Sequence, residues 1–159
     1  MRDSLVEWIL SITKSQQELS GLPICPYARQ AYISNAYDIQ QTDYHKVETD
    51  IANCDLVKYQ VVILYYQDYE QHTADHLVSK TKELNKLYNS QDIVILDNDP
   101  RQPLILEGVQ TTYDKCYLWI VQPLADLNIK TEQLRKTKYY SHWTQEQLDE
   151  VVTWRFEIN

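Results

Sequence analysis

The chain has 159 residues, of which 43% are hydrophobic and 24% charged, and a formal net charge of −8 at pH 7. This length suits one globular domain over residues 1–159, and the composition is typical of an ordered protein. The acidic balance argues against a general binder of nucleic acid or anionic membranes, because both need a basic surface. The only two glycines are Gly21 and Gly108, so the glycine-rich loops that cradle phosphates are excluded.

The compartment is predicted from the apolar runs and the cysteines. No stretch approaches the roughly 18 apolar residues of a membrane span. The first residues carry acids in a helical pattern and do not resemble a signal peptide. The three cysteines, Cys25, Cys54 and Cys116, make an odd count with wide spacing. We therefore expect reduced thiols, no disulfide, no membrane association and a cytoplasmic location.

Two helices are predicted in the first part of the chain. Ser4 followed by Glu7 fits a capping box, and apolar side chains at helical spacing extend the predicted helix over residues 4–18. A second, shorter helix is predicted over residues 26–35. It begins with Pro26, whose fixed φ and missing N–H suit a first helical turn.

Hydrophobic patterns in the middle of the chain predict four strands and one long helix. Weak alternation over residues 37–43 indicates an edge strand. Continuous apolar runs over 59–66, 93–96 and 116–121 indicate strands covered on both faces. Residues 72–89 form the most regular amphipathic helix. The side chains expected to be almost fully buried are those of Leu64, Leu84, Ile95 and Leu118.

The remaining elements complete a mixed fold. A loop over residues 98–113 is predicted to hold an irregular hairpin, and loops of that length are often functional. A helix is predicted over 124–136, and Thr144 with Gln147 forms a capping box for a last helix. This order predicts an α+β (or α/β) single-domain sandwich, with a four-stranded mixed sheet packed against about five helices.

The segment around Cys25 is the first candidate site. Pro23 and Pro26 bracket this cysteine at a loop-to-helix junction. The positive end of a helix dipole favours a thiolate, so we expect the pKa of Cys25 to fall. Cys25 is the candidate catalytic residue, with Pro26 and Tyr27 as candidate binding residues beside it. The alternative is a small apolar side chain packed at the start of a helix.

Cys25-Pro26-Tyr27 resembles the first three residues of the Cys-Pro-Tyr-Cys motif of glutaredoxins. The resemblance then stops, because Ala28 stands in place of the second cysteine. The segment before Cys25 is also predicted to be helical, whereas the glutaredoxin motif follows a strand. Dithiol chemistry through a local pair is therefore excluded, and a reaction of one thiol remains as a hypothesis.

Two further clusters have the residue types of metal sites. His72 and His76 stand one helical turn apart, with Glu70 and Asp75 nearby. Asp97-Asn98-Asp99 follows a buried strand, where carboxylates can hold magnesium. Solvated histidines and an ordinary turn before Pro100 explain the same residues, so we expect no metal and no cofactor.

Cations and aromatic side chains are interleaved over residues 130–143. Such a mixture can hold a phosphate, stack a base or dock an acidic partner. The binding candidates here are Lys136, Lys138, Tyr139 and His142. The alternative is a plain loop between two helices.

Three functions compete on this basis. The first is a non-enzymatic interaction or accessory module with a protein partner or a second copy, favoured by the missing catalytic signature and the many tyrosines. The second is a thiol-dependent protein acting through Cys25, and the third binds a nucleotide or nucleic acid on residues 130–143. We expect Leu22–Ala28 to line the main concave site, and we expect neither the histidine pair nor Asp97–Asp99 to do so.

Overall fold

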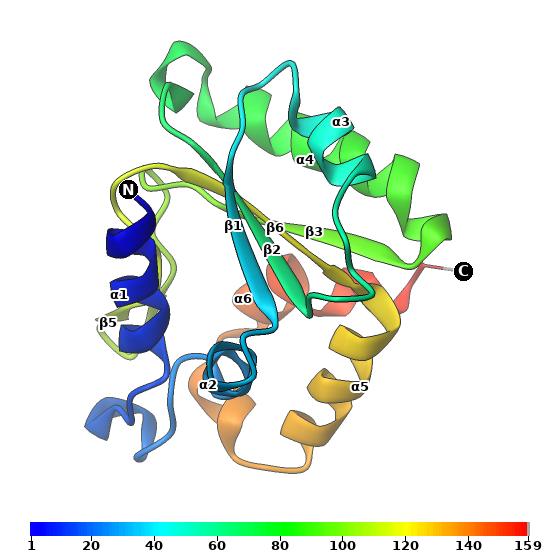
Figure 1. Cartoon of the computed structure of the whole chain (residues 1–159). Helices are drawn as coiled ribbons and strands as arrows, with labels where there is room; N and C mark the ends of the chain where they lie inside the picture. Colours follow the sequence, from blue (N-terminus) through cyan, green and yellow to red (C-terminus); the bar gives the residue numbers. More distant parts are fainter. Residues whose placement is uncertain (159) are drawn as a thin grey trace.

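The computed structural model describes residues 1–158 and builds one mixed sheet from four strands (Figure 1). In spatial order the strands are β1 (Tyr37–Gln41), β2 (Val61–Tyr66), β6 (Tyr117–Pro123) and β3 (Ile93–Asn98). β1 runs parallel to β2, whereas β6 is antiparallel to both of its neighbours. The predicted α+β architecture is confirmed, and β1 lies at an edge of the sheet as expected.

Helices surround this sheet on both faces. The α-helices of residues 1–158 are α1 (Arg2–Ile12), α2 (Pro26–Ile33), α3 (Val47–Ala52), α4 (Ala74–Tyr88), α5 (Leu124–Arg135) and α6 (Gln145–Val151). Short 3₁₀ helices are η1 (Gln17–Leu19), η2 (Tyr69–Gln71), η3 (Asn89–Gln91), η4 (Tyr139–His142) and η5 (Thr153–Phe156). The predicted hairpin in the long loop is confirmed as β4 (Ile105–Leu106) and β5 (Val109–Gln110). Within the described residues, no helix is long and apolar enough to cross a membrane.

One face of the sheet is closed tightly by α3 and α4. Alternate side chains of β2 and β6, such as those of Leu64 and Trp119, pack there against the apolar face of α4 and are fully buried. Such a face excludes water along the whole width of the sheet. The expected burial is confirmed at Leu64, Leu84, Ile95 and Leu118, whose exposed fractions are 0%, 1%, 1% and 0%.

The opposite face is covered unevenly. α1 and α2 pack over β1 and β2, where Ile9 and Ile63 belong to a second buried cluster. Toward β3 and β6 the same face is less covered, and Leu96, Ile120 and Gln122 are only half-buried. Figure 1 shows α3 and α4 on one side of the sheet, with α1, α2, α5 and α6 arranged around the other.

The first helix differs from its prediction at both ends. Met1 is the N-cap, and no side chain caps the helix. The Ser4 hydroxyl instead accepts a hydrogen bond from Lys115 Nζ at 2.6 Å, so a distant segment replaces the predicted capping box. The helix ends at Ile12, earlier than expected, because Ser15 already pairs with the following loop in a β-bridge.

Among the other helices, the start of α6 was predicted correctly and α3 was not predicted. The capping box of α6 is confirmed, with Gln147 N–H donating to Thr144 Oγ1 at 3.2 Å. Helix α3 was missed because it is short and its apolar positions are few. Its anchors are Val47 and Ile51, which are one turn apart and almost fully buried against α4 and the sheet.

Candidate functional site

A large cavity lies along the β3 edge of the sheet, and its lining extends from the unevenly covered face to Thr81 and Asn85 of α4. Its volume is about 1200 Å³, and its lining is mostly apolar. Leu96 and Ile120 of the sheet line it, together with Trp8 of α1, Leu127 of α5 and Trp143. The cavity exists because α1 and α2 cover β1 and β2, while the C-terminal helices do not close over β3 and β6 to the same degree. This arrangement makes the cavity the first candidate for a binding site.

Of the segment predicted to line the main concave site, Leu22–Ala28, residues Ile24 to Ala28 line this cavity, whereas Leu22 and Pro23 do not. Cys25 is the N-cap of α2, and its own N–H donates to Ile12 O at 2.9 Å. The expectation of a lowered pKa is wrong: burial raises the pKa of Cys25, although the backbone N–H groups of Ala28 and Tyr27 oppose this effect. Desolvation of the thiolate therefore outweighs the helix N-terminus, and the thiol stays protonated at neutral pH.

The two residues after Cys25 belong to the first turn of α2, and the second of them contacts α5. Pro26 occupies the first helical position of α2 and also lines the cavity. The Tyr27 hydroxyl donates to Gln133 Oε1 at 2.8 Å, and Lys130 Nζ lies 5.4 Å from the Tyr27 ring centroid. Tyr27 thus joins α2 to α5 across one side of the cavity.

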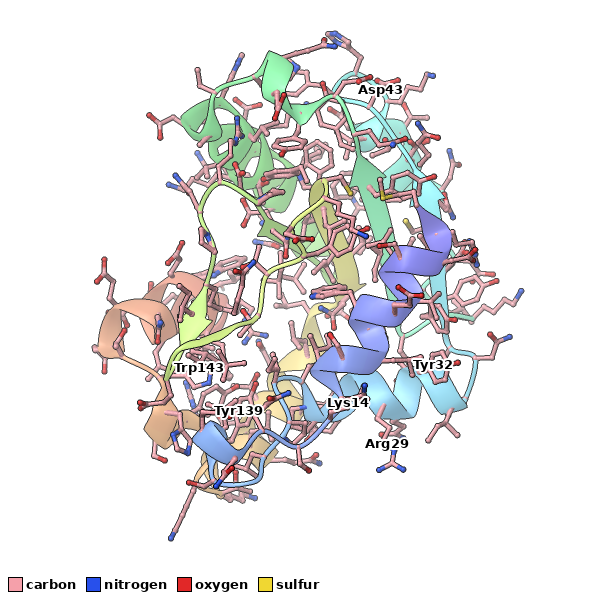
Figure 2. All side chains as sticks on the ribbon, turned by 90° about the vertical axis from the view of Figure 1, so that its left-hand side faces the viewer. Lys14, Arg29, Tyr32, Asp43, Tyr139 and Trp143 are labelled. Atoms are coloured by element: carbon pink, nitrogen blue, oxygen red, sulfur yellow. The ribbon has the colours of Figure 1, made fainter. Side chains whose placement is uncertain are left out.

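The basic and aromatic segment is divided by the fold. Tyr139 is buried, and its hydroxyl donates to the carbonyl oxygen of Ile24. Figure 2 shows Tyr139 and Trp143 close together at one end of the molecule, far from Asp43 at the other end. Both line the cavity, and their ring centroids are 6.0 Å apart. The aromatic rings therefore face inward and are not free to stack a base on the surface.

The polar members of this segment lie elsewhere. Lys136 and Lys138 are exposed and do not belong to the cavity lining. His142 lies 3.1 Å from Ser20 Oγ through Nε2, and its Nδ1 lies 3.8 Å from Glu107 Oε1. The structure therefore does not bring the four predicted binding residues of this segment together.

The Asp97–Asp99 turn lines the cavity too, so the expectation that it lies elsewhere is wrong. The reason is that β3 is an edge strand, and its last residues border the opening. Asp97 Oδ2 accepts from the Tyr117 hydroxyl at 2.8 Å, and burial raises the pKa of Asp97. Asp99 forms a two-pronged pair with Arg101, at 2.9 and 2.7 Å. Asn98 is bonded to the backbone that leads into β6. Each side chain of the turn is thus bound to other parts of the protein.

The histidine pair lies at the same end of the sheet as the Asp97–Asp99 turn, outside the cavity lining, and packs against Tyr44. The His72 and Tyr44 rings are stacked with centroids 4.1 Å apart, and His76 lies 5.4 Å from His72. Burial lowers the pKa of His72, and the neighbouring His76 and His45 lower it further. Within residues 1–158, no three His, Cys, Asp or Glu side chains form a grouping suited to a metal ion.

One residue of the cavity was not recognised from the sequence. Arg155, in η5, lines the cavity and is only 3% exposed. Its Nη2 donates to Thr131 Oγ1 at 3.2 Å, whereas Nε and Nη1 have no partner within the described residues. The available signal was its place one turn after Val151 and Val152, on the apolar face of the last helix.

Comparisons with known proteins assign no family to this chain. No protein-family model, no curated protein and no solved structure matches it. Its function must therefore be inferred from its own residues.

Proposed function

We propose that this protein is a non-catalytic binding module and that a largely apolar small molecule is its ligand. The observation that carries this proposal is the cavity of about 1200 Å³, whose lining surface is mostly apolar. Pockets for drug-sized ligands typically measure roughly 300–1,000 Å³ and have a similar lining. Aromatic side chains supply much of the apolar surface; they include those of Trp8, Tyr32, Tyr140, Trp143 and Trp154.

The chemistry of the cavity supports binding over catalysis. The thiol of Cys25 has a raised pKa, which disfavours the thiolate that a nucleophile requires. The Asp99 carboxylate forms an ion pair with Arg101, and Asp97 Oδ2 accepts a hydrogen bond from the Tyr117 hydroxyl. No observation favours the thiol-dependent alternative. The nucleotide alternative also loses support, because Tyr139 is buried and because Lys136 and Lys138 lie outside the cavity lining.

The compartment is proposed from the state of the cysteines. The free state of Cys25, Cys54 and Cys116 supports a reducing compartment such as the cytoplasm. A protein partner or a second copy stays a prediction. The exposed apolar side chains of Ile33 and Ile129 are on different helices, α2 and α5, so they do not single out one docking face. Sedimentation of the purified chain at two concentrations would test self-association.

The cavity can be tested with a neutral apolar dye such as Nile red. We expect saturable binding with one dye molecule per chain. Leu96→Trp adds an aromatic side chain to the cavity lining, and it should weaken binding by at least about tenfold, or roughly 1.4 kcal/mol. Leu87→Trp is the matched control, because Leu87 is exposed on α4 and does not line the cavity.

Circular dichroism should show that both variants remain folded, since tryptophan is well tolerated in strands and the cavity offers space. The proposal is contradicted if the unmodified protein binds no dye saturably. It is equally contradicted if both variants bind the dye as tightly as the unmodified protein.

A further inference from the structure

Arg155 carries a buried charge whose hydrogen-bonding capacity is mostly unused. The residue is 3% exposed, yet two of its guanidinium nitrogens, Nε and Nη1, have no partner within residues 1–158. Native proteins pair almost every buried polar atom, so such a group calls for an explanation. Three other arginines do have carboxylate partners: Arg2 pairs with Asp38, Arg101 with Asp99 and Arg135 with Glu132.

No anion of the described residues compensates this charge. Burial lowers the pKa of Arg155 to about 10; Tyr140 opposes this effect, and Arg135 adds to it. Burial in turn raises the pKa of Tyr140, so its hydroxyl is neutral at pH 7. The remaining bond of the guanidinium, from Nη2, goes to the neutral hydroxyl of Thr131. Arg155 is therefore charged at pH 7 and has no counter-ion among residues 1–158.

Keeping such a charge in the interior is costly. Removing an ion from water costs several kcal/mol in a real protein, and only good pairing recovers that cost. The guanidinium is a planar fork that suits the two oxygens of a carboxylate or phosphate. Because Arg155 lines the same cavity as Leu127, Leu134 and Trp154, an anion bound there would have apolar surface next to it.

We propose that Arg155 anchors an amphipathic anion, with a carboxylate or phosphate head on its guanidinium and an apolar chain in the cavity. This inference rests on the proposed binding function and adds the chemical class of the ligand. The bond from Nη2 to Thr131 Oγ1 holds the guanidinium in place, so Thr131 is a positioning residue. Nε and Nη1 are closed off from solvent in the ligand-free structure, so the head group must displace atoms that now pack against them.

Three probes that share the same alkyl chain separate the effect of a charged head group from that of the apolar chain. Dodecanoate, dodecyl phosphate and the neutral dodecan-1-ol are titrated calorimetrically, below their aggregation concentrations and at mildly alkaline pH. We expect the better anion to bind about tenfold to a hundredfold more tightly than the alcohol, the range for a hydrogen bond to a charged group. The preference between the two anions identifies the head group.

Variants then locate the preference. Arg155→Met keeps a long apolar side chain and should abolish the preference for anions, while the alcohol binds as before. Arg155→Lys keeps the charge without the fork and should retain part of the preference. Arg135→Met is the matched control: it removes an exposed charge from the end of α5 and should leave the preference intact.

The outcomes distinguish this inference from the proposed function. If none of the three probes binds, the binding function itself fails. If all three bind the unmodified protein equally, the cavity binds apolar molecules but Arg155 is no anion anchor. The same conclusion follows if Arg155→Met keeps the full preference for anions. If Arg155→Met does not fold, the guanidinium is already well hydrogen-bonded inside the protein, and the inference fails.

A second readout uses the ligand-free protein. An unpaired buried charge destabilises the fold, so Arg155→Met should unfold at the same or a higher urea concentration than the unmodified protein. Asn128 is an alternative hydrogen-bond partner for the Arg155 guanidinium, because its Oδ1 is also buried and unpaired. If Arg155 donated to Asn128 Oδ1 in solution, Arg155→Met would be clearly destabilised, and the unused hydrogen-bonding capacity on which the inference rests would be absent.

Discussion

Asn85 of α4 takes the place of a missing neighbour strand at the edge of the sheet. β3 is the last strand in the sheet order, so the N–H and C=O groups of Ile95 that point outward have no strand to pair with. The Asn85 side chain meets both: Ile95 N–H donates to Oδ1 at 2.9 Å, and Nδ2 donates to Ile95 O at 2.7 Å. Asn85 is 7% exposed and Ile95 is 1% exposed, so water does not readily replace these bonds.

Asn85→Leu removes both bonds and preserves the approximate size of the side chain. Each buried polar group left unpaired costs about 1–3 kcal/mol, so the two groups of Ile95 together cost roughly 2–6 kcal/mol. Burial of the leucine side chain recovers at most about 1.5–3 kcal/mol. We therefore expect the free energy of unfolding to fall by about 1–3 kcal/mol, and the melting temperature to fall by roughly 2–12 °C.

Urea unfolding followed by tryptophan fluorescence measures this loss directly. The matched control is Asn53→Leu, since Asn53 is exposed and its side chain donates only to Thr49 O one turn earlier. That variant should change the free energy of unfolding by no more than about 0.5 kcal/mol. A loss below about 1 kcal/mol for Asn85→Leu would show that water, and not Asn85, satisfies the edge of β3.

Three further predictions follow from the burial of particular side chains. Because burial raises the pKa of Cys25, its thiol should react with a small alkylating reagent at neutral pH more slowly than free cysteine does, with a rate that rises with pH; a faster reaction would contradict the burial. Ile95→Ala should lower the free energy of unfolding by about 2–5 kcal/mol in urea unfolding, and a loss below about 1 kcal/mol would mean that β3 is not part of the core. The folded-state pKa of His72 is lowered from 6.5, so folding disfavours its protonation, and stability should fall as the pH drops through 6.5 toward the folded value. His72→Phe keeps a ring against Tyr44 and should lose part of this acid sensitivity, measured by urea unfolding at about pH 7.5 and about pH 5.5; an unchanged pH dependence would contradict the assignment.

Much of the fold could be predicted from the sequence because its signals are local. Continuous apolar runs identified β2, β3 and β6, and the spacing of apolar residues identified α4. Pro26 marked the start of α2, and Thr144 marked the start of α6. Local signals failed where a distant segment competes for the same group, as Lys115 does for the hydroxyl of Ser4.

The candidate site depended on the tertiary structure. The sequence by itself placed Cys25 at a helix start, since the signal of Pro26 at the first helical position involves only neighbouring residues. It did not determine the strand order, which makes β3 an edge strand and brings Asp97 to the cavity. It also did not determine how deeply Cys25 and Arg155 are buried. Burial depends on every element packed around a group, and it is burial that raises the pKa of Cys25 and leaves the Arg155 guanidinium without a counter-ion among residues 1–158.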